Sequence, residues 1–290
     1  MTATATVTAF EAIGTTWRIS TDAPLHPALR REVDDVVEQY DRTFSRFRRD
    51  SAVTRLAETG GPVDLGPWAP PLLDLLIRLA GCTAGAMTPL VGGALEHLGY
   101  GPDYRLDAAE GYRSAPPIEV LHVDGGVVAL DVPAVLDVGS AGKGQLVDLV
   151  AGLLAGAGHA AFTVDAGGDL RTAGPAVRVA LEHPFDRSAA IGVVEVRDAA
   201  IAGSAPNRRT WTAAAGRRLH HVLDARTGRP VDTVAATWAL ADSAMLADGL
   251  ATALFLVPPE ALGGFAFTWL RMATDGRAHW SPDLPGEVFR

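Results

Sequence analysis

The sequence predicts an α+β fold in which mainly antiparallel sheets are flanked by helices. Segments with the apolar pattern of strands outnumber those with helical spacing, and the two kinds do not alternate strictly along the chain. Strict alternation would instead indicate a parallel sheet with crossover helices. Turns at Asp124-Gly125-Gly126 and Asp275-Gly276 lie between apolar runs, which is typical of hairpins.

The N-terminal half opens with alternating residues and then changes to helical spacing. Val33, Val36, Val37 and Tyr40 recur with the period of one helix face. The predicted elements of this half are a strand over 5–20 broken at Gly14, a helix over 29–44, short helices near 72–80 and 90–98, and a hairpin within 118–131.

The C-terminal half is predicted to be richer in strands. Its predicted elements are a strand at 135–138, a helix over 143–154, strands at 161–164, 177–182, 191–196, 219–223 and 235–241, a helix that contains Asp248, and a last hairpin at 275–276.

Composition limits the classes of function. The 290 residues carry no internal repeat and no clear linker, so we expect one domain over residues 1–290, or two intimately packed lobes. A net charge of −9 argues against nucleic-acid binding, and Cys82, the single cysteine, excludes a disulfide framework. The N-terminus lacks the pattern of a signal peptide, and no apolar run reaches membrane-spanning length. A cytoplasmic protein without membrane insertion is therefore expected.

Asp248 and Thr252 are the most informative pair in the chain. They lie in an Ala/Leu-rich run that predicts a helix, with Asp242 or Ser243 as its N-cap. A spacing of four places the carboxylate and the hydroxyl on one face, where they offer half of a site for a hard cation. The alternative is that Thr252 bonds to the carbonyl of residue 248 while Asp248 faces water.

A glycine-rich turn around Lys143 is predicted to join the strand at 135–138 to the following helix. Small residues there allow backbone amides to approach an anion, and Lys143 adds a full positive charge. Asp137 and Gly144 occupy positions where a Walker A loop requires Gly and Ser or Thr, so the turn is not of that type. A tight turn with a surface lysine is the alternative.

The adjacent histidines His220 and His221 form a second cluster. Neighbouring residues of a strand point to opposite faces, so only one of the two can face a given site. A neutral imidazole in a site could serve as a general base, and the alternative is a histidine satisfied within the core.

Three further turns carry polar groups. Gly167-Gly168-Asp169 allows positive φ and close backbone approach. The segment from Ser204 to Arg209 ends in two arginines, Arg208 and Arg209, that could hold a phosphate, and Arg226-Thr227-Gly228 forms a turn that can hold an anion. Taken alone, the glycine turn is more simply interpreted as a plain turn, and the two arginines could equally decorate a loop.

Taken in order, these motifs resemble the ApbE family of FAD:protein FMN transferases over roughly residues 10–281. The motifs that carry the resemblance are Gly-Lys-Gly at 142–144, Gly-Gly-Asp at 167–169, His-His-Val-Leu-Asp-Ala-Arg-Thr-Gly at 220–228 and Ala-Asp-Gly-Leu-Ala-Thr at 247–252. The resemblance implies an ApbE-like α+β fold. It also implies an Mg²⁺-dependent enzyme that cleaves the pyrophosphate of FAD and transfers FMN to a Thr or Ser of a partner protein, releasing AMP.

The same resemblance implies roles for individual residues. It assigns Mg²⁺ to Asp248, Thr252 and the main-chain carbonyl of Ser140, and acid/base chemistry to His221. It places Lys143, which we also expect to be catalytic, in the flavin site. The residues expected to bind FAD are Ser140, Lys143, Gly167, Gly168, Asp169, Ser204 and Thr227.

Three motifs depart from the family pattern. Thr88 stands where the family usually has Asp, Gly203-Ser204-Ala205 replaces Thr-Ser-Gly, and Ala225 replaces Pro. Two alternatives therefore stay open. One is an Mg²⁺-dependent FAD pyrophosphatase that yields AMP and free FMN, and the other is an FAD-binding protein without turnover.

Overall fold

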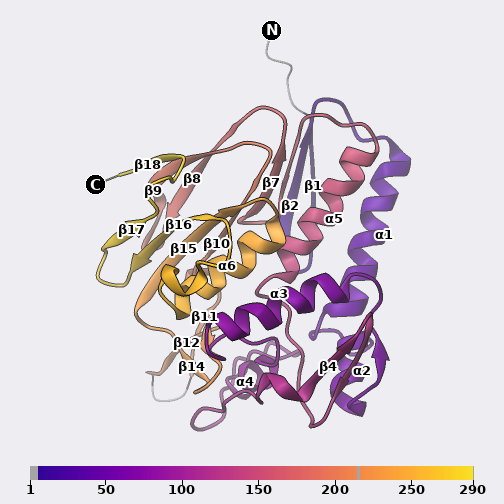
Figure 1. The fold of residues 1–290 in the computed structure, drawn as a ribbon, viewed down its shortest axis with the longest axis vertical. Coiled ribbons are helices and arrows are strands. Elements are labelled where there is room, and N and C mark those ends of the chain that lie inside the picture. The colour runs from indigo at the N-terminus through magenta and orange to yellow at the C-terminus, as the bar shows by residue number, and fades with distance from the viewer. Residues whose placement is uncertain (1–5, 214–215, 290) are drawn as a thin grey trace.

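An eight-stranded sheet forms the centre of the molecule in the computed structural model, which describes residues 6–213 and 216–289 except the side chain of Arg208 (Figure 1). Its strands lie in the order β1-β2-β6-β7-β10-β15-β16-β17, and every neighbouring pair is antiparallel. The strands are β1 (Thr6–Ala12), β2 (Thr15–Thr21), β6 (Phe162–Asp165), β7 (Asp169–Ala173), β10 (Ala200–Ser204), β15 (Val234–Ala241), β16 (Thr268–Ala273) and β17 (Ala278–Trp280).

Smaller sheets and six α-helices complete the described fold. The sheet β3-β5-β4 comprises Val63–Asp64, Val127–Leu130 and Leu121–Asp124, and the sheet β18-β9-β8 comprises Gly286–Val288, Asp186–Val196 and Val177–His183. Two ribbons pair β11 (Thr210–Thr212) with β12 (Arg218–His220) and β13 (Leu223–Asp224) with β14 (Arg229–Pro230). The helices are α1 (Pro27–Phe44), α2 (Ala52–Thr59), α3 (Ala69–Cys82), α4 (Gly92–His97), α5 (Gly142–Gly156) and α6 (Ala244–Leu256).

The central sheet is covered on both faces, and residue size differs between them. Helices α5 and α6 pack on one face, with α1 and α3 outside them (Figure 1). Ala200 and Ala202 of β10 belong to this helical core, whereas Ile201 between them belongs to the core shared with β8 and β9. Because side chains alternate along a strand, small residues face the helices and large ones face the smaller sheet.

Most predicted elements are confirmed, including the α+β class, the antiparallel sheets and the hairpins. Two predicted strands are wrong. Residues 135–138 form no strand, so the glycine-rich turn follows an irregular segment, and the strand predicted over 219–223 is interrupted at His221 and Val222. In both places buried residues continue the apolar pattern of a strand, but their backbones do not pair with another strand. Periodicity alone does not distinguish a paired strand from an unpaired buried segment.

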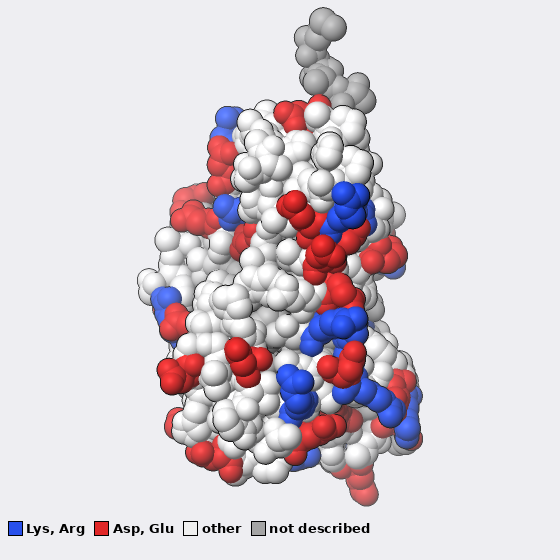
Figure 2. Space-filling model, turned by 90° about the vertical axis from the view of Figure 1, so that its right-hand side faces the viewer, with Lys and Arg blue, Asp and Glu red and all other residues white. Residues whose placement is uncertain are grey.

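The surface combines charges of both signs. On the face shown in Figure 2, Lys and Arg side chains lie among Asp and Glu side chains rather than in a patch of their own. Within the described residues, no helix is both long and apolar enough to cross a membrane.

Candidate active site

A cavity of about 550 Å³ lies where the turn before α5, the β6–β7 turn, the end of β10, the bend after β12 and α6 meet. All predicted site residues except Asp169 and Thr227 line it. They are Ser140, Lys143, Gly167, Gly168, Ser204, His221, Asp248 and Thr252.

Helix α6 presents Asp248 and Thr252 to this cavity. Ser243 is the N-cap of the helix, and its hydroxyl accepts the amide hydrogen bond of Leu246 at 3.2 Å. Asp248 is only 5% exposed, which contradicts the alternative of a water-facing carboxylate. The Thr252 hydroxyl lies 3.4 Å from that of Ser204, on the last residue of β10.

Asp169 lies immediately behind the cavity wall. It is 1% exposed and forms an ion pair with Lys143. The Lys143 ammonium contacts Oδ2 of this carboxylate, which is otherwise enclosed by the protein. Burial and then the charge of Asp169 raise the pKa of Asp248 well above its usual range, and Lys143 offsets this only in part. The two carboxylates thus share one cation and repel each other.

The Gly167-Gly168 turn connects β6 to β7 at the cavity edge. Both glycines have positive φ, 65° and 122°, which favours residues without a Cβ. The Asp165 carboxylate accepts the amide hydrogen bonds of Gly167 at 2.9 Å and Gly168 at 3.3 Å. The turn therefore offers a surface without side chains, while its amides are already bonded.

His221 lies in the bend after β12 and faces the cavity, whereas His220 points away and contacts the Val231 carbonyl oxygen through Nε2 at 3.0 Å. The Nδ1 atom of His221 is buried and has no hydrogen-bond partner among the described residues. Burial, followed by the positive charges of Arg209 and His220, lowers the pKa of His221 to about 3. The imidazole is therefore neutral at physiological pH.

Arg46 and Asp137 form a buried ion pair beneath the cavity that the sequence patterns do not predict. Arg46 Nε donates to Asp137 Oδ2 at 2.5 Å, and the Gly139 amide donates to Asp137 Oδ1 at 2.7 Å. Burial alone would raise the pKa of Asp137, but the charge and hydrogen bond of Arg46 keep it below its usual value. Only the position of Asp137 two residues before a glycine could have indicated part of this arrangement.

An aromatic wall also went unpredicted. Phe47, Tyr100 and Trp238 line the cavity, and Tyr100 stacks on Trp211 with ring centroids 5.6 Å apart. Arg209 donates a hydrogen bond to the Tyr100 hydroxyl at 3.1 Å, which places one of the two predicted arginines at the cavity. The aromatic residues come from separate segments, so no local motif identifies them.

Thr227 does not belong to the cavity lining. It is exposed in the turn after β13, where its hydroxyl accepts the Arg229 amide hydrogen bond at 3.2 Å. Arg226 is engaged with Asp224, whereas the side chain of Arg208 lies outside the described residues. Thr88, one of the departures from the family pattern, lines the cavity and is 6% exposed.

The donor set at the cavity suits a hard cation. No group of three His, Cys, Asp or Glu side chains that could hold a metal occurs among the described residues. Asp248, Thr252 and Ser140, which line the cavity, instead carry oxygen atoms, the donor type that a hard cation such as Mg²⁺ prefers. A cation would also relieve the repulsion between Asp248 and Asp169, so these residues fit the group.

Comparison with known proteins agrees with this geometry. The chain is 31% identical to an FAD:protein FMN transferase of Vibrio cholerae over 248 residues, which cover 80% of this chain and 74% of the relative. The fold matches the flavin transferase ApbE from Vibrio cholerae with a TM-score of 0.80 at 25% identity, covering 97% of this chain and 98% of that one. An ApbE protein from Thermotoga maritima has the same fold, with a TM-score of 0.83 at 22% identity over 96% of this chain and 97% of its own.

A family model supplies the remaining comparison. It matches residues 13–271, a span that includes every element lining the cavity. The chain therefore belongs to the ApbE family.

Proposed function

We propose that this protein is an FAD:protein FMN transferase. The enzyme cleaves the pyrophosphate of FAD, attaches FMN through a phosphodiester to a Thr or Ser hydroxyl of a target protein, and releases AMP. One observation carries the proposal: a buried pair of carboxylates with Lys143 lies in the same cavity region as a neutral, desolvated histidine. The activity named for the Vibrio cholerae relative supports it.

Asp248, Thr252 and the Ser140 carbonyl would hold Mg²⁺, and Asp169 lies close enough to stabilise the bound ion electrostatically. Bound there, the ion would supply positive charge to the pyrophosphate oxygens as the phosphorus–oxygen bond breaks. Asp248 and Asp169 would then be ionised together without mutual repulsion.

We assign to His221 the role of accepting the proton of the acceptor hydroxyl, which the negative charge of bound FAD would favour by raising its basicity. Its low pKa keeps it neutral, so a free electron pair is available at neutral pH. The acceptor oxygen forms a new bond to the phosphorus of the FMN half, the bridging bond of the pyrophosphate breaks, and AMP leaves with the electron pair. The proton of the hydroxyl is taken up by His221.

Lys143 and the glycine turn would orient the substrate. The ion pair with Asp169 fixes the Lys143 ammonium at the start of α5, where it can also donate to a phosphate oxygen. Because the amides of Gly167 and Gly168 already bond to Asp165, we expect FAD to rest on the bare surface of this turn. Ser204 and the aromatic wall complete the pocket.

AMP release from FAD tests this proposal. We expect AMP in the presence of Mg²⁺ and a target protein, with FMN bound covalently to that protein. AMP release should fall steeply with EDTA or with Asp248→Ala, and transfer should be lost with His221→Ala. Unchanged FMN transfer in either variant would overturn the assignment.

The products distinguish the alternatives. Free FMN with AMP would indicate a pyrophosphatase, in which water replaces the acceptor hydroxyl, and tight FAD binding without AMP would indicate a binding protein. The cytoplasmic location stays a prediction, to be tested by cell fractionation.

A further inference from the structure

Helices α5 and α6 each bind backbone amides in the first turn of the other helix through a carboxylate. Asp248 of α6 accepts the amide hydrogen bond of Gly144 in α5 through Oδ2 at 3.1 Å. In return, Asp148 of α5 accepts the amide hydrogen bonds of Ala244 through Oδ1 and of Met245 through Oδ2, both at 2.9 Å. Each helix thus satisfies amides that the other helix leaves unpaired at its N-terminus.

Two further contacts hold this junction together. A Cβ at Gly144 would collide with the backbone of Ala244, so the helices approach more closely than any other residue would allow. Arg171 of β7 donates through Nη1 to Asp148 Oδ1 at 3.3 Å and also to the carbonyl oxygen of Asp242, just before α6. Arg171 thus connects the junction between α5 and α6 to strand β7 of the central sheet.

We propose that Asp148 is a positioning residue for the reaction, which holds the first turn of α6 against α5 and so fixes Asp248 opposite Lys143. Asp148 does not line the cavity, so it acts only through α6. Lys143 precedes Gly144 directly, and Asp248 lies about 6 Å along the helix axis from Ala244. A small tilt of this turn would therefore change the distance between Asp248 and the oxygen donors opposite it.

Asp148 does more than cap a helix, because α6 already has a local cap. The Ser243 hydroxyl accepts the Leu246 amide hydrogen bond without contacting α5. Ser243→Ala therefore removes one hydrogen bond from the same helix end but leaves the junction intact, which makes it a matched control. Asp148→Asn keeps the side-chain shape, yet it offers only one acceptor oxygen and turns an NH₂ donor toward the second amide.

The test is calorimetric titration of Mg²⁺ into FAD-free protein, with AMP release measured as a function of Mg²⁺ concentration. For Asp148→Asn we expect the Mg²⁺ concentration at half-saturation to rise about tenfold in both measurements, the size typical of supporting groups behind metal ligands. At saturating Mg²⁺, kcat should recover most of its original value. For Ser243→Ala both midpoints should stay unchanged although the melting temperature falls.

The inference rests on the proposed function, but the two can fail separately. A wild-type protein that binds Mg²⁺ without releasing AMP overturns the proposed function and leaves the calorimetric comparison valid. Wild-type Mg²⁺ affinity in Asp148→Asn overturns the positioning role, and a wild type that binds no Mg²⁺ overturns both. If Asp148→Asn does not fold, Arg171→Gln takes its place. An unchanged Mg²⁺ midpoint in that variant then overturns the inference.

Discussion

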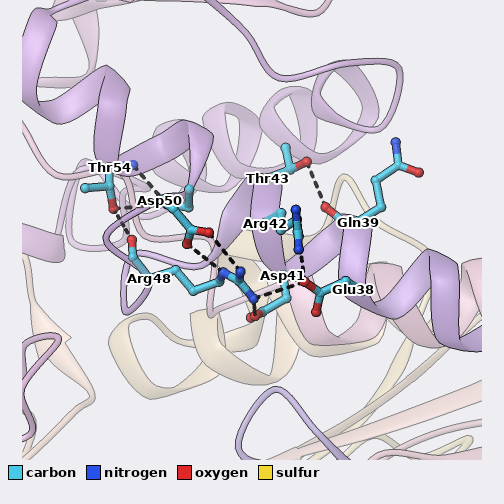
Figure 3. Close-up of polar contacts among 9 residues, drawn as sticks. Glu38, Gln39, Asp41, Arg42, Thr43, Arg48, Asp50 and Thr54 are labelled. Carbon is cyan, nitrogen blue, oxygen red and sulfur yellow. Dashed lines mark hydrogen bonds and ion pairs between the residues drawn. The ribbon is translucent and has the colours of Figure 1, made fainter.

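The molecule contains two clusters in which a cation meets several carboxylates, and they differ in almost every physical respect. At the surface, Arg48 bonds to both oxygens of Asp50 at 3.0 Å and to Asp41 at 3.0 Å, with Glu38 beside them (Figure 3). In the interior, Lys143 faces Asp169 and Asp248, which are 1% and 5% exposed.

The surface cluster is satisfied and the interior cluster is not. Arg48 directs its donors at carboxylates that also contact water, and its hydrogen bonds lower the pKa of Asp50. The hydrogen bond of Arg42, and to a smaller extent the charge of Arg48, lowers the pKa of Glu38. In the interior, the single cation Lys143 faces two buried carboxylates, and burial followed by the charge of Asp169 raises the pKa of Asp248. The comparison teaches that ion pairing alone does not identify a site, whereas buried charge left uncompensated does.

The largest expected effect comes from removing the interior carboxylate of Asp248. For Asp248→Ala we expect AMP release to fall about a thousandfold, because the substitution removes a carboxylate proposed to hold the cation that offsets charge on the reacting phosphates. In EDTA the same variant should be more stable than the wild type, because a buried, repelled carboxylate is gone. Measurement of AMP release and urea denaturation checks both effects, with Asp50→Ala as the surface control that should change neither. A less stable Asp248→Ala protein in EDTA would contradict the comparison.

Breaking the buried pair beneath the cavity should have the next largest effect. Arg46 and Asp137 are 3% and 13% exposed at their side chains, so Arg46→Met leaves a carboxylate without its partner. We expect a loss of about 3 kcal/mol in the free energy of unfolding. Chemical denaturation at neutral pH measures it, and a loss no greater than that of a surface substitution would show that the pair is not buried in solution.

The third largest effect is expected in the pH dependence of stability, and it comes from His221. Its pKa of about 3 in the folded protein lies below its ordinary value near 6.5, so folding holds it neutral where the unfolded chain binds a proton. Stability is therefore lost as pH falls below about 6.5, by about 2 kcal/mol between pH 7 and pH 5. Denaturation of the wild type and His221→Gln at both pH values tests this, since the variant should lack that part of the loss. Equal losses would argue against a buried neutral His221.

The smallest effect is expected at the surface cluster. Arg48→Met removes several ion pairs at once, yet exposed pairs gain little because water screens them. We expect unchanged AMP release and a free energy of unfolding within the error of the measurement. A loss comparable to that of Arg46→Met would mean that the network itself holds the segment carrying Arg46 and Phe47 in place.

The sequence predicts contacts between residues that are close along the chain, but not contacts between residues that are far apart along it. Asp248 and Thr252 share a face because the helical period is fixed, and the hairpins follow from local turn chemistry. Arg46 and Asp137 are 91 residues apart, and Asp148 and Ala244 are 96 apart, so only the folded chain brings them together. Similarly, where the predicted strand is interrupted, the ring of His221 lies 6.3 Å from that of Tyr100, a neighbour that the local pattern does not reveal.

The alanines on the helical face of the central sheet have a consequence for how site geometry is encoded. Ala200, Ala202, Ala239 and Ala241 separate the sheet from the helices by little more than a methyl group each. Thr237, on the same strand as two of them, donates a hydrogen bond to the carbonyl oxygen of Ala251 in α6 at 2.6 Å. These side chains work as spacers of fixed thickness. The position of Asp248 and Thr252 thus depends partly on the size of residues that do not react. Larger side chains at these alanine positions would shift α6 although they do not contact the cavity.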